Sequence, residues 1–404
     1  MEEWKEVRLD SLVNRKICYG IVQPGFSPKN GIPVIKVNNV VKGLRDVSEC
    51  DKTTEEISNS YKRTILKGGE LIISLVGTVG CVDIAPSSFA GANLVRATGM
   101  IDIEDELIKH WVLYYIRTRQ GQQYIEENLN TTVQRALNIK DLCKMPIPIT
   151  SKHYMGRIVS ILKSLDDKIE VNRKINENLE QQAQALFKSW FVDFEPFKNG
   201  EFVESELGMI PKGWKIKSLS EIADYVNGLA MQKYRPEDGE IGLPVLKIKE
   251  LGQGSFDTNS EYCSPSKIGE KYIIKDGDII FSWSGTLMVK IWCGGKCGLN
   301  QHLFNVVTKD YPKWFAYQWT RHYLDNFIRI AKDKAVTMGH IKRGELDKAK
   351  VLIPESHHMK TISDIMKPIH LQMISNELKS RRLAELRDTL LPKLMSGELK
   401  VNEK

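Results

Sequence analysis

Apolar residues recur with two different spacings along this chain of 404 residues. Two stretches, about 1–150 and 211–354, carry short β-branched runs such as Leu71 to Val76, separated by glycine, proline and asparagine. Each stretch is followed by a highly charged segment with few glycines, in which apolar residues alternate at steps of four and three. The first pattern is typical of a compact domain of short strands and helices. The second is typical of a long helix with a coiled-coil seam.

The second half of the chain repeats the first with a period near 205 residues. One chance match would mean little, but six matches in the same order indicate a duplication, so we expect both halves to share one fold. The matched segments are EWKEVRLDSLV with GWKIKSLSEIA, PVIKVNNV with PVLKIKEL, LKGGELIISLVGT with IKDGDIIFSWSGT, GAN with GLN, WVLY with WFAY, and HYMGRIVSILKSL with HHMKTISDIMKPI.

The seam of the first charged segment predicts a helix from about Arg157 to Phe191, and the second segment repeats every seam position with an offset of 204. Such a helix extends about 50 Å at 1.5 Å per residue, which is longer than a small domain is wide. We therefore predict that the two helices pair, although a single seam would also fit a helix packed on its own domain. The residues expected to pair the helices are Leu162, Leu165, Ile169, Asn172, Leu179, Met366, Ile369, Met373, Asn376 and Leu383.

Both seams are interrupted at the same place by polar residues, Asn172 and Asn176 in the first and Asn376 and Ser380 in the second. A polar residue at a seam position costs stability but fixes register and orientation. If the helices pair antiparallel, their middles meet, and Asn172 is expected to lie close to Asn376. Leucine at both positions is then expected to raise stability.

An aromatic cluster follows the first seam, in the segment QALFKSWFVDFEPF at 184–197. At the tip of a projecting helix these rings have little of their own domain around them, which favours an interface anchor. The alternative is that Phe191, Phe194 and Phe197 fold back between the helix and the second domain.

Composition adds few constraints. The chain is 42% hydrophobic and 27% charged, has no apolar run of 18 residues, and begins with an acidic amphipathic segment rather than a signal peptide, so we expect a cytoplasmic protein without a membrane span. Seven scattered cysteines are expected to be reduced. Cys293, Cys297 and His302 do not have the spacing of a zinc site, and we expect no metal. A net charge of +7 is compatible with a polyanionic partner.

Catalytic motifs are missing from the sequence. It contains no Gly-rich phosphate loop and no Asn-Pro-Pro-aromatic or Asp-Pro-Pro-aromatic tetrapeptide of the type found in adenine methyltransferases. Glu-x-Lys triplets at 377–379 and 398–400 lie on or beside the charged C-terminal helix, where such pairs are usually solvated. We therefore expect no catalytic residues.

Side chains suited to DNA recognition are concentrated in two segments of each repeat, although each segment is also compatible with an ordinary polar loop. Arg, Lys, Asn and Gln read base edges, and Lys and Arg also contact phosphates. Residues 211–354 carry 22 basic against 16 acidic residues, compared with 19 against 18 over 1–150, so we expect the second domain to hold phosphate more strongly. The candidate DNA-binding residues are Arg117, Arg119, Gln134, Arg135, Lys247, Lys249, Lys332, Lys334, His340 and Lys342.

The helix-end segments ALFKSWFVDFEPF and LRDTLLPKLMSGEL, the segment IPKGWKIKSLSEI and the two SxxGT turns resemble the specificity subunits of type I restriction-modification systems. The resemblance covers the whole chain and implies an α+β fold, with two pseudo-repeated mixed α/β target recognition domains joined by two long antiparallel coiled-coil helices. The implied boundaries are 1–150 for the first target recognition domain, 151–194 for the central helix, 195–210 for a linker, 211–354 for the second domain, and 355–404 for the C-terminal helix and tail.

The resemblance also implies a non-catalytic subunit that binds double-stranded DNA at a bipartite target, two methyltransferase subunits, and restriction or translocase subunits. S-adenosylmethionine, ATP and Mg²⁺ would then serve the partners, with no cofactor bound by this chain. Two alternatives are a coiled-coil scaffold that binds protein alone, and a recognition subunit whose partner combines methylation with cleavage. The residues implied to bind a partner are Phe187, Trp190, Phe191, Phe194, Leu391 and Leu394.

Overall fold

The computed structural model describes residues 4–130, 134–333 and 340–401, and the chain divides into two compact units. Unit 1 consists of Met1–Asp167 and Ala384–Lys404, and unit 2 consists of Lys168–Leu383. Both long helices, α6 (Lys152–Phe191) and α12 (Ser356–Met395), contribute residues to each unit. The first helix begins five residues before the predicted Arg157, and its first turns are anchored by buried Tyr154 and Met155.

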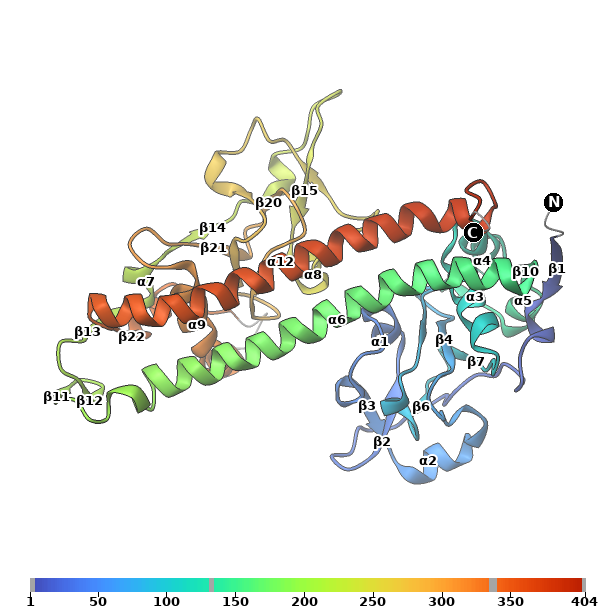
Figure 1. Ribbon diagram of the computed structural model, residues 1–404, viewed down its shortest axis with the longest axis horizontal. Helices are drawn as coiled ribbons and strands as arrows, with labels where there is room; N and C mark the ends of the chain where they lie inside the picture. Colours follow the sequence, from blue (N-terminus) through green and yellow to red (C-terminus); the bar gives the residue numbers. More distant parts are fainter. Residues whose placement is uncertain (1–3, 131–133, 334–339, 402–404) are drawn as a thin grey trace. The chain divides into compact units, whose positions relative to one another are not determined.

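In unit 1, two three-stranded sheets and several helices surround apolar cores (Figure 1). One of these sheets has the order β5-β4-β7 and the other β3-β2-β6, in which β2 and β6 are parallel, and the pairs β1-β10 and β8-β9 form two further two-stranded sheets. The strands are β1 (Lys5–Arg8), β2 (Ile32–Ile35), β3 (Asp51–Thr53), β4 (Leu71–Ser74), β5 (Val82–Ile84), β6 (Asn93–Leu94), β7 (Thr98–Ile101), β8 (Leu129–Asn130), β9 (Ala136–Leu137) and β10 (Pro146–Ile149). The shorter helices are α1 (Val37–Lys42), α2 (Glu55–Ser60), α3 (Glu106–Arg117), α4 (Arg119–Glu127) and α5 (Ile139–Cys143).

Unit 2 is built in the same way, with sheets ordered β14-β21-β18-β19 and β16-β15-β20-β17. Its strands are β11 (Phe202–Ser205), β12 (Gly208–Pro211), β13 (Lys215–Ser218), β14 (Asp224–Asn227), β15 (Leu243–Leu246), β16 (Tyr262–Cys263), β17 (Ile273–Ile274), β18 (Ile279–Ser282), β19 (Met288–Ile291), β20 (Cys297–Leu299), β21 (Leu303–Val307) and β22 (Lys350–Ile353). Its shorter helices are α7 (Leu219–Ile222), α8 (Ile248–Gln253), α9 (Lys313–His322), α10 (Leu324–Asp333) and α11 (Gly344–Lys348).

The strand pairings of the two units correspond, so the predicted duplication is present in the fold. β4 pairs with β5 and β7 as β18 pairs with β19 and β21, and β2 runs parallel to β6 as β15 runs parallel to β20. β4 and β18 also explain the continuous apolar runs in the sequence. Successive strand residues point to opposite faces, and Leu71 and Ile73 enter one core while Ile72 enters another. Both faces of β4 are therefore buried.

One of the matched segments is out of register. Val34 pairs with Asn93 between β2 and β6, whereas the equivalent Val245 pairs with Gly298 between β15 and β20. Asn93 therefore corresponds to Gly298 and not to Asn300, as the GAN and GLN tripeptides had suggested. Asn93 is fully buried and bonded to Thr64 and Ser58, a role that Gly298 does not share.

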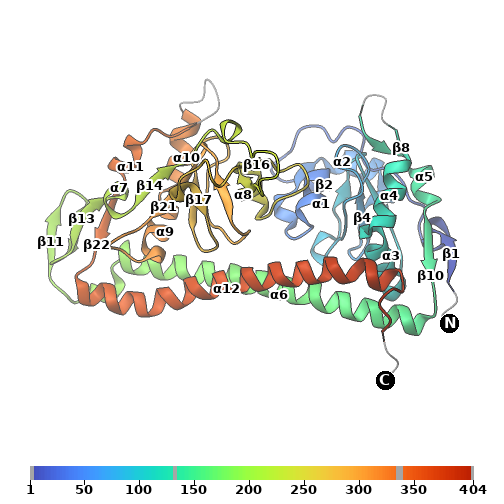
Figure 2. The ribbon, with the colours of Figure 1, turned by 90° about the horizontal axis from the view of Figure 1, so that it is seen from above.

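Within unit 2, α6 and α12 run antiparallel and side by side (Figure 2), as the sequence predicts. The polar residues pair differently from the prediction. Asn172 donates from Nδ2 to Ser380 Oγ at 3.1 Å, and Asn376 donates from Nδ2 to Asn176 Oδ1 at 3.0 Å. Asn172 and Asn376, which were expected to lie close together, each bond to a different residue, because the midpoint of the pair lies two residues farther along each helix than equal positions 172 and 376 imply.

The predicted seam residues are all at least half-buried, and their burial depends on position. Toward the helix ends Leu162 and Met366 join the apolar cores of unit 1 and unit 2, whereas in the middle of the pair the two asparagines are buried and the apolar seam side chains remain partly exposed. The fully buried members are Leu162, Asn172, Met366 and Asn376. The half-buried members are Leu165, Ile169, Leu179, Ile369, Met373 and Leu383.

The aromatic cluster after α6 lies in the core of unit 2. Phe187 and Phe191 are 4% and 2% exposed, and Trp190 and Phe194 pack against the same core. Phe191 contacts Phe187, Trp214 and Trp319, with ring centroids 5.0 to 5.8 Å apart. The prediction of a projecting partner-binding cluster is therefore wrong, and the rings fold back against the second domain.

The end of α12 is buried in the same manner. Leu391 and Leu394 are 5% and 2% exposed and belong to the core of unit 1, with Leu162 and Trp111. The predicted partner-binding role is wrong for these residues too, because they complete the core of the first domain.

The segment predicted as a linker, 195–210, has its own structure. Phe194 adopts a left-handed conformation with φ of 54°, after which the chain forms a short helical turn at Glu195–Phe197 and most of the β11–β12 hairpin. Phe194 and Phe197 both pack edge-on against Trp214, with centroids 5.8 and 5.0 Å from it. This packing holds the segment against the rest of unit 2.

None of the helices in the described part of the chain is long and apolar enough to cross a bilayer.

Candidate nucleic-acid interface

The SxxGT segments form a turn after β4 and after β18. Ser74 and Ser282 are fully buried, and Gly77 and Gly285 have φ of 78° and 64°, a conformation that glycine adopts without a steric penalty. Ser74 Oγ accepts a hydrogen bond from Cys81 N at 2.9 Å. The serine and glycine of this motif therefore shape the turn.

Each turn is bonded through its backbone to a second loop, which carries predicted DNA-binding residues. In unit 1, Gly77 N donates to Arg135 O at 2.9 Å, and Leu137 N donates to Leu75 O. In unit 2, Ser284 forms a bridge with His340, and Ile341 N donates to Trp283 O at 3.1 Å. Ala136 and His340 thus occupy equivalent positions beside the two turns, and Arg135 directly precedes Ala136.

The structure adds a third segment to this face in unit 1, which sequence reasoning missed. Arg96 is exposed, and its guanidinium lies over the ring of Tyr19 at 5.9 Å from the centroid. Tyr19 is 38% exposed, and its hydroxyl accepts a hydrogen bond from Ile139 N at 3.3 Å. No carboxylate in the part of the chain that the structure describes pairs with Arg96, which leaves its N–H groups available to a ligand.

The equivalent face of unit 2 was also missed. Trp283 Nε1 donates to Asn227 Oδ1 at 3.1 Å, and the Trp283 ring contacts the rings of His302 and His340, with centroids 6.2 Å from each. Gln301 lies next to His302 and bonds to it. The sequence signal was present, since GLNQH and SWSGT carry these side chains, but only the sheet brings residues 227, 283, 301 and 340 together.

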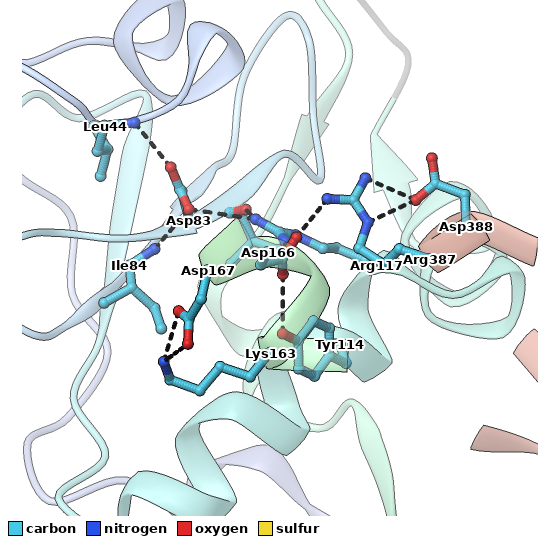
Figure 3. A network of polar contacts seen from close by, with 11 residues as sticks. Leu44, Asp83, Ile84, Tyr114, Arg117, Lys163, Asp166, Asp167, Arg387 and Asp388 are labelled. Carbon is cyan, nitrogen blue, oxygen red and sulfur yellow. Dashed lines mark hydrogen bonds and ion pairs between the residues drawn. The ribbon is translucent and has the colours of Figure 1, made fainter. Parts of the chain in front are cut away.

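Arg117 occupies a different environment from the one predicted (Figure 3). Its guanidinium donates to Val82 O at 3.1 Å and Asp83 Oδ1 at 3.3 Å, and it lies 3.7 Å from Asp166. Asp166 also accepts from Tyr114 and, at 2.6 Å, from Arg387. Arg117 is therefore held by carboxylates inside unit 1, and the prediction of a DNA-contacting side chain is wrong for this residue.

The remaining predicted residues are distributed over the surface. Arg135 is exposed and paired with Glu126, Lys247 is paired with Glu261 at 2.5 Å, and Lys249 with Asp257 at 2.6 Å. The hydrogen bond to Asp257 raises the pKa of Lys249, so this side chain stays charged. Lys334 lies outside the described residues. The other exposed members of the predicted set are Arg119, Gln134, Lys332, His340 and Lys342.

The cysteines do not form a metal site. All seven are free thiols, and Cys293 and Cys297 are buried. Burial raises the pKa of Cys293 to about 12, so the thiolate that a metal requires is disfavoured. His302, the third residue considered, bonds to Ser284 and Gln301.

Glu355, His357 and His358 form a group that sequence reasoning missed, with ligand atoms within 4.8 Å of one another. The group lies at the start of α12, where the helix dipole disfavours a cation. Glu355 and His357 are also exposed. These residues are thus weakly suited to hold a metal ion.

Two copies of one mixed domain, each presenting hydrogen-bonding side chains beside an equivalent turn and each attached to a paired helix, define a two-domain recognition protein without an assembled catalytic group in the described residues. The comparison with known families specifies the class. The model of the type I restriction modification DNA specificity domain matches residues 1–181 and 211–387, and the chain belongs to this family. The predicted resemblance and the α+β architecture with duplicated DNA-recognition domains are confirmed.

Relatives of this chain are also specificity subunits of type I restriction enzymes. The chain is similar to the type I restriction enzyme MjaIX specificity subunit of Methanocaldococcus jannaschii, with 27% identity over 90% of this chain and 84% of the relative. It is also similar to the HindI specificity subunit of Haemophilus influenzae, with 22% identity over 99% of this chain and all of the relative. A solved type I S subunit from M. genitalium covers 100% of this chain and 97% of its own, with 14% identity and a TM-score of 0.47.

Proposed function

We propose that this specificity subunit reads a bipartite DNA target, one half with each repeated domain, and docks methyltransferase and restriction subunits. The observation that carries the proposal is the duplication itself. Two domains of one fold carry different side chains at an equivalent exposed face, and they are attached to a helix pair whose midpoint is fixed by polar contacts in the seam. Such a chain is suited to reading two different short sequences at a set separation.

Catalysis is assigned to the partner subunits, which would use S-adenosylmethionine, ATP and Mg²⁺. Neither phosphate-loop nor methyltransferase motifs occur in the sequence. The side chains that face the solvent beside the turns are donors and acceptors suited to base edges and phosphates.

The proposal is tested by expressing the full chain with the methyltransferase subunit of its own system and mapping modified adenines across the host genome. We expect modification at one asymmetric sequence made of two short specific parts separated by a fixed number of unspecified base pairs. Modification at a continuous short sequence would contradict the bipartite reading.

A measurement of DNA affinity distinguishes the proposed function from the alternative, a scaffold that binds only protein. The assembled complex is expected to bind its target with an affinity that falls steeply with salt, because phosphate contacts release counterions. A complex that forms with the methyltransferase but shows no salt-dependent DNA binding would favour the scaffold.

A further inference from the structure

Arg96 and Gln301 occupy the same position of the repeated fold. In unit 1, Ile21 N donates to Leu94 O and Arg96 N donates to Ile21 O, both at 2.7 Å. In unit 2, Leu229 N donates to Leu299 O at 2.9 Å, and Gln301 N donates to Leu229 O at 2.8 Å. Each residue therefore lies two positions beyond the strand that pairs in parallel with β2 or β15, namely β6 or β20, and its backbone is held by the same hydrogen bonds.

This backbone has little freedom to shift. A Cβ atom at Gly20 would lie 2.1 Å from Leu94 O, and one at Gly228 would lie 2.2 Å from Asn300 O, so glycine is required for the close approach of the two chains. The side chains at 96 and 301 thus project from equivalent, rigid points beside the SxxGT turn. At these two points the domains differ in the side chain that they present.

The carboxamide of Gln301 is oriented by a chain of hydrogen bonds. Gln301 Nε2 lies 3.3 Å from His302 Nε2, and His302 Nδ1 lies 3.0 Å from Ser284 Oγ. Because an amide nitrogen only donates, His302 Nε2 accepts, and the ring proton sits on Nδ1 and is donated to Ser284. Gln301 keeps one N–H and its carbonyl oxygen, side by side, for a ligand.

Arg96 is oriented by an aromatic ring instead. Its guanidinium lies over Tyr19, whose hydroxyl is held by Ile139 N. Stacking on an aromatic ring leaves the N–H edge of a guanidinium open. The first domain thus presents a fork of donors where the second presents a donor next to an acceptor.

We propose that Arg96 and Gln301 are base-reading residues of the two domains, so that the half-site of the first domain contains a guanine read by Arg96 and the half-site of the second contains an adenine read by Gln301. A fork of donors matches the O6 and N7 acceptors of guanine, and a carboxamide matches the N6 donor and N7 acceptor of adenine in the major groove. The inference rests on the proposed function. His302 and Tyr19 act as positioning residues.

The test uses the full chain with its methyltransferase, and maps modified adenines for the wild type and for Arg96→Ala, Gln301→Ala and Gln301→Glu. Each alanine variant is expected to lose discrimination at one base pair, in one half-site only, by roughly tenfold to a hundredfold. Gln301→Glu is isosteric and replaces the donor by an acceptor, so the preference at that base pair is expected to change from adenine to cytosine.

Arg45→Ala and Gln253→Ala are matched controls, since they remove a side chain of the same type at an exposed position of the same domain. They are expected to leave the target unchanged. Thermal melting of each variant reports folding, and Gln301→Glu keeps the test decisive if an alanine variant is unstable.

The outcomes separate the two proposals. A wild-type complex that modifies no defined sequence overturns the proposed function, and this inference with it. A wild-type complex with a defined bipartite target, combined with Arg96 and Gln301 variants that keep wild-type preference at every position, overturns the inference alone. Relaxation of both half-sites by one variant also overturns it, because the effect would then be a general loss of binding.

Discussion

At the residue scale, the same side-chain type has different roles according to what surrounds it. Arg117 and Arg96 are both arginines of the first domain, but Arg117 is held by Asp83 and lies beside Asp166, whereas Arg96 stacks on Tyr19 at the surface. A charged side chain that is partly buried among carboxylates is costly to release. Arg117 thus serves the interior of unit 1, and Arg96 is available for recognition.

Phe191→Ala is expected to lower the free energy of unfolding by about 3 to 5 kcal/mol, because a buried ring is lost from a packed aromatic core. Val192→Ala is the neighbouring control, since Val192 is 42% exposed. Thermal or denaturant unfolding measures the difference. A Phe191→Ala protein that melts like the wild type but no longer captures the methyltransferase would show that the ring is an interface anchor after all.

His370 predicts a pH dependence of stability. It is 7% exposed, its Nε2 has no hydrogen-bond partner among the described residues, and burial, together with the charge of Lys313, lowers its pKa from 6.5 to about 4. The unfolded chain therefore binds a proton between pH 6.5 and 4 that the folded chain does not, so stability is present above this window and is lost as the pH falls through it. The loss is on the order of 3 kcal/mol.

The measurement is chemical denaturation at several pH values for the wild type and His370→Leu. Carboxylates titrate in both proteins, so the difference between them isolates His370. Parallel pH curves for the two proteins would contradict the assignment.

At the scale of elements, the helix pair is specified by the polar contacts in the middle of its seam. Asn376 is bonded to Asn176, and Asn172 to Ser380, while Asn176 Nδ2 also donates to Met373 O at 3.0 Å. These contacts provide hydrogen-bond partners for the side chains of Asn172 and Asn376, each of which is only 3% exposed. They hold one register, since a shift by one heptad would place amides against apolar side chains.

These hydrogen bonds contradict the expectation from the sequence that leucine at positions 172 and 376 raises stability. Asn172→Leu with Asn376→Leu is expected to lower stability, by about 1 to 3 kcal/mol for each partner left unsatisfied. Replacing all four polar residues, with Asn176→Leu and Ser380→Ala added, is expected to restore or exceed wild-type stability, because both partners of each bond become apolar.

Denaturant unfolding compares the double and the fourfold variant, with Gln181→Leu as an exposed control on the same helix. A double variant more stable than the wild type would show that the amides contribute little to the pairing.

At the scale of the whole molecule, each long helix completes the domain of the other repeat. The end of α6 supplies Phe187 and Phe191 to the core of unit 2, and the end of α12 supplies Leu391 and Met395, the same positions plus 204, to the core of unit 1. The first repeat alone therefore lacks part of its own core. The core of each unit is therefore completed by a helix end from the other repeat.

A fragment of residues 1–200 is consequently expected to dimerise, since α6 of one copy would stand where α12 stands on the other, with Phe187 and Phe191 at the positions of Leu391 and Met395. Size-exclusion chromatography measures this, and a fragment of residues 1–183, which lacks both rings, is the control expected to stay monomeric. With the methyltransferase, the dimer is expected to modify an interrupted palindrome built from the half-site of the first domain. Continued modification of the original asymmetric sequence would show that the second domain does not read DNA.

The sequence by itself determined the duplication, the two matched seam helices and the mixed domains, because these follow from local periodicity and from matches between segments, whereas the antiparallel orientation of the helices was implied only by the family resemblance. It located the SxxGT turns and the loops of Arg135 and His340, but not the pairing of Asn172 with Ser380. The tertiary structure decided which aromatic rings are buried, that Arg117 is enclosed by carboxylates, and that residues 96 and 301 are equivalent. The physical reason is that burial, ion pairing and surface clustering depend on residues far apart in the chain, such as Asp166 and Arg387, and periodicity reports only near neighbours.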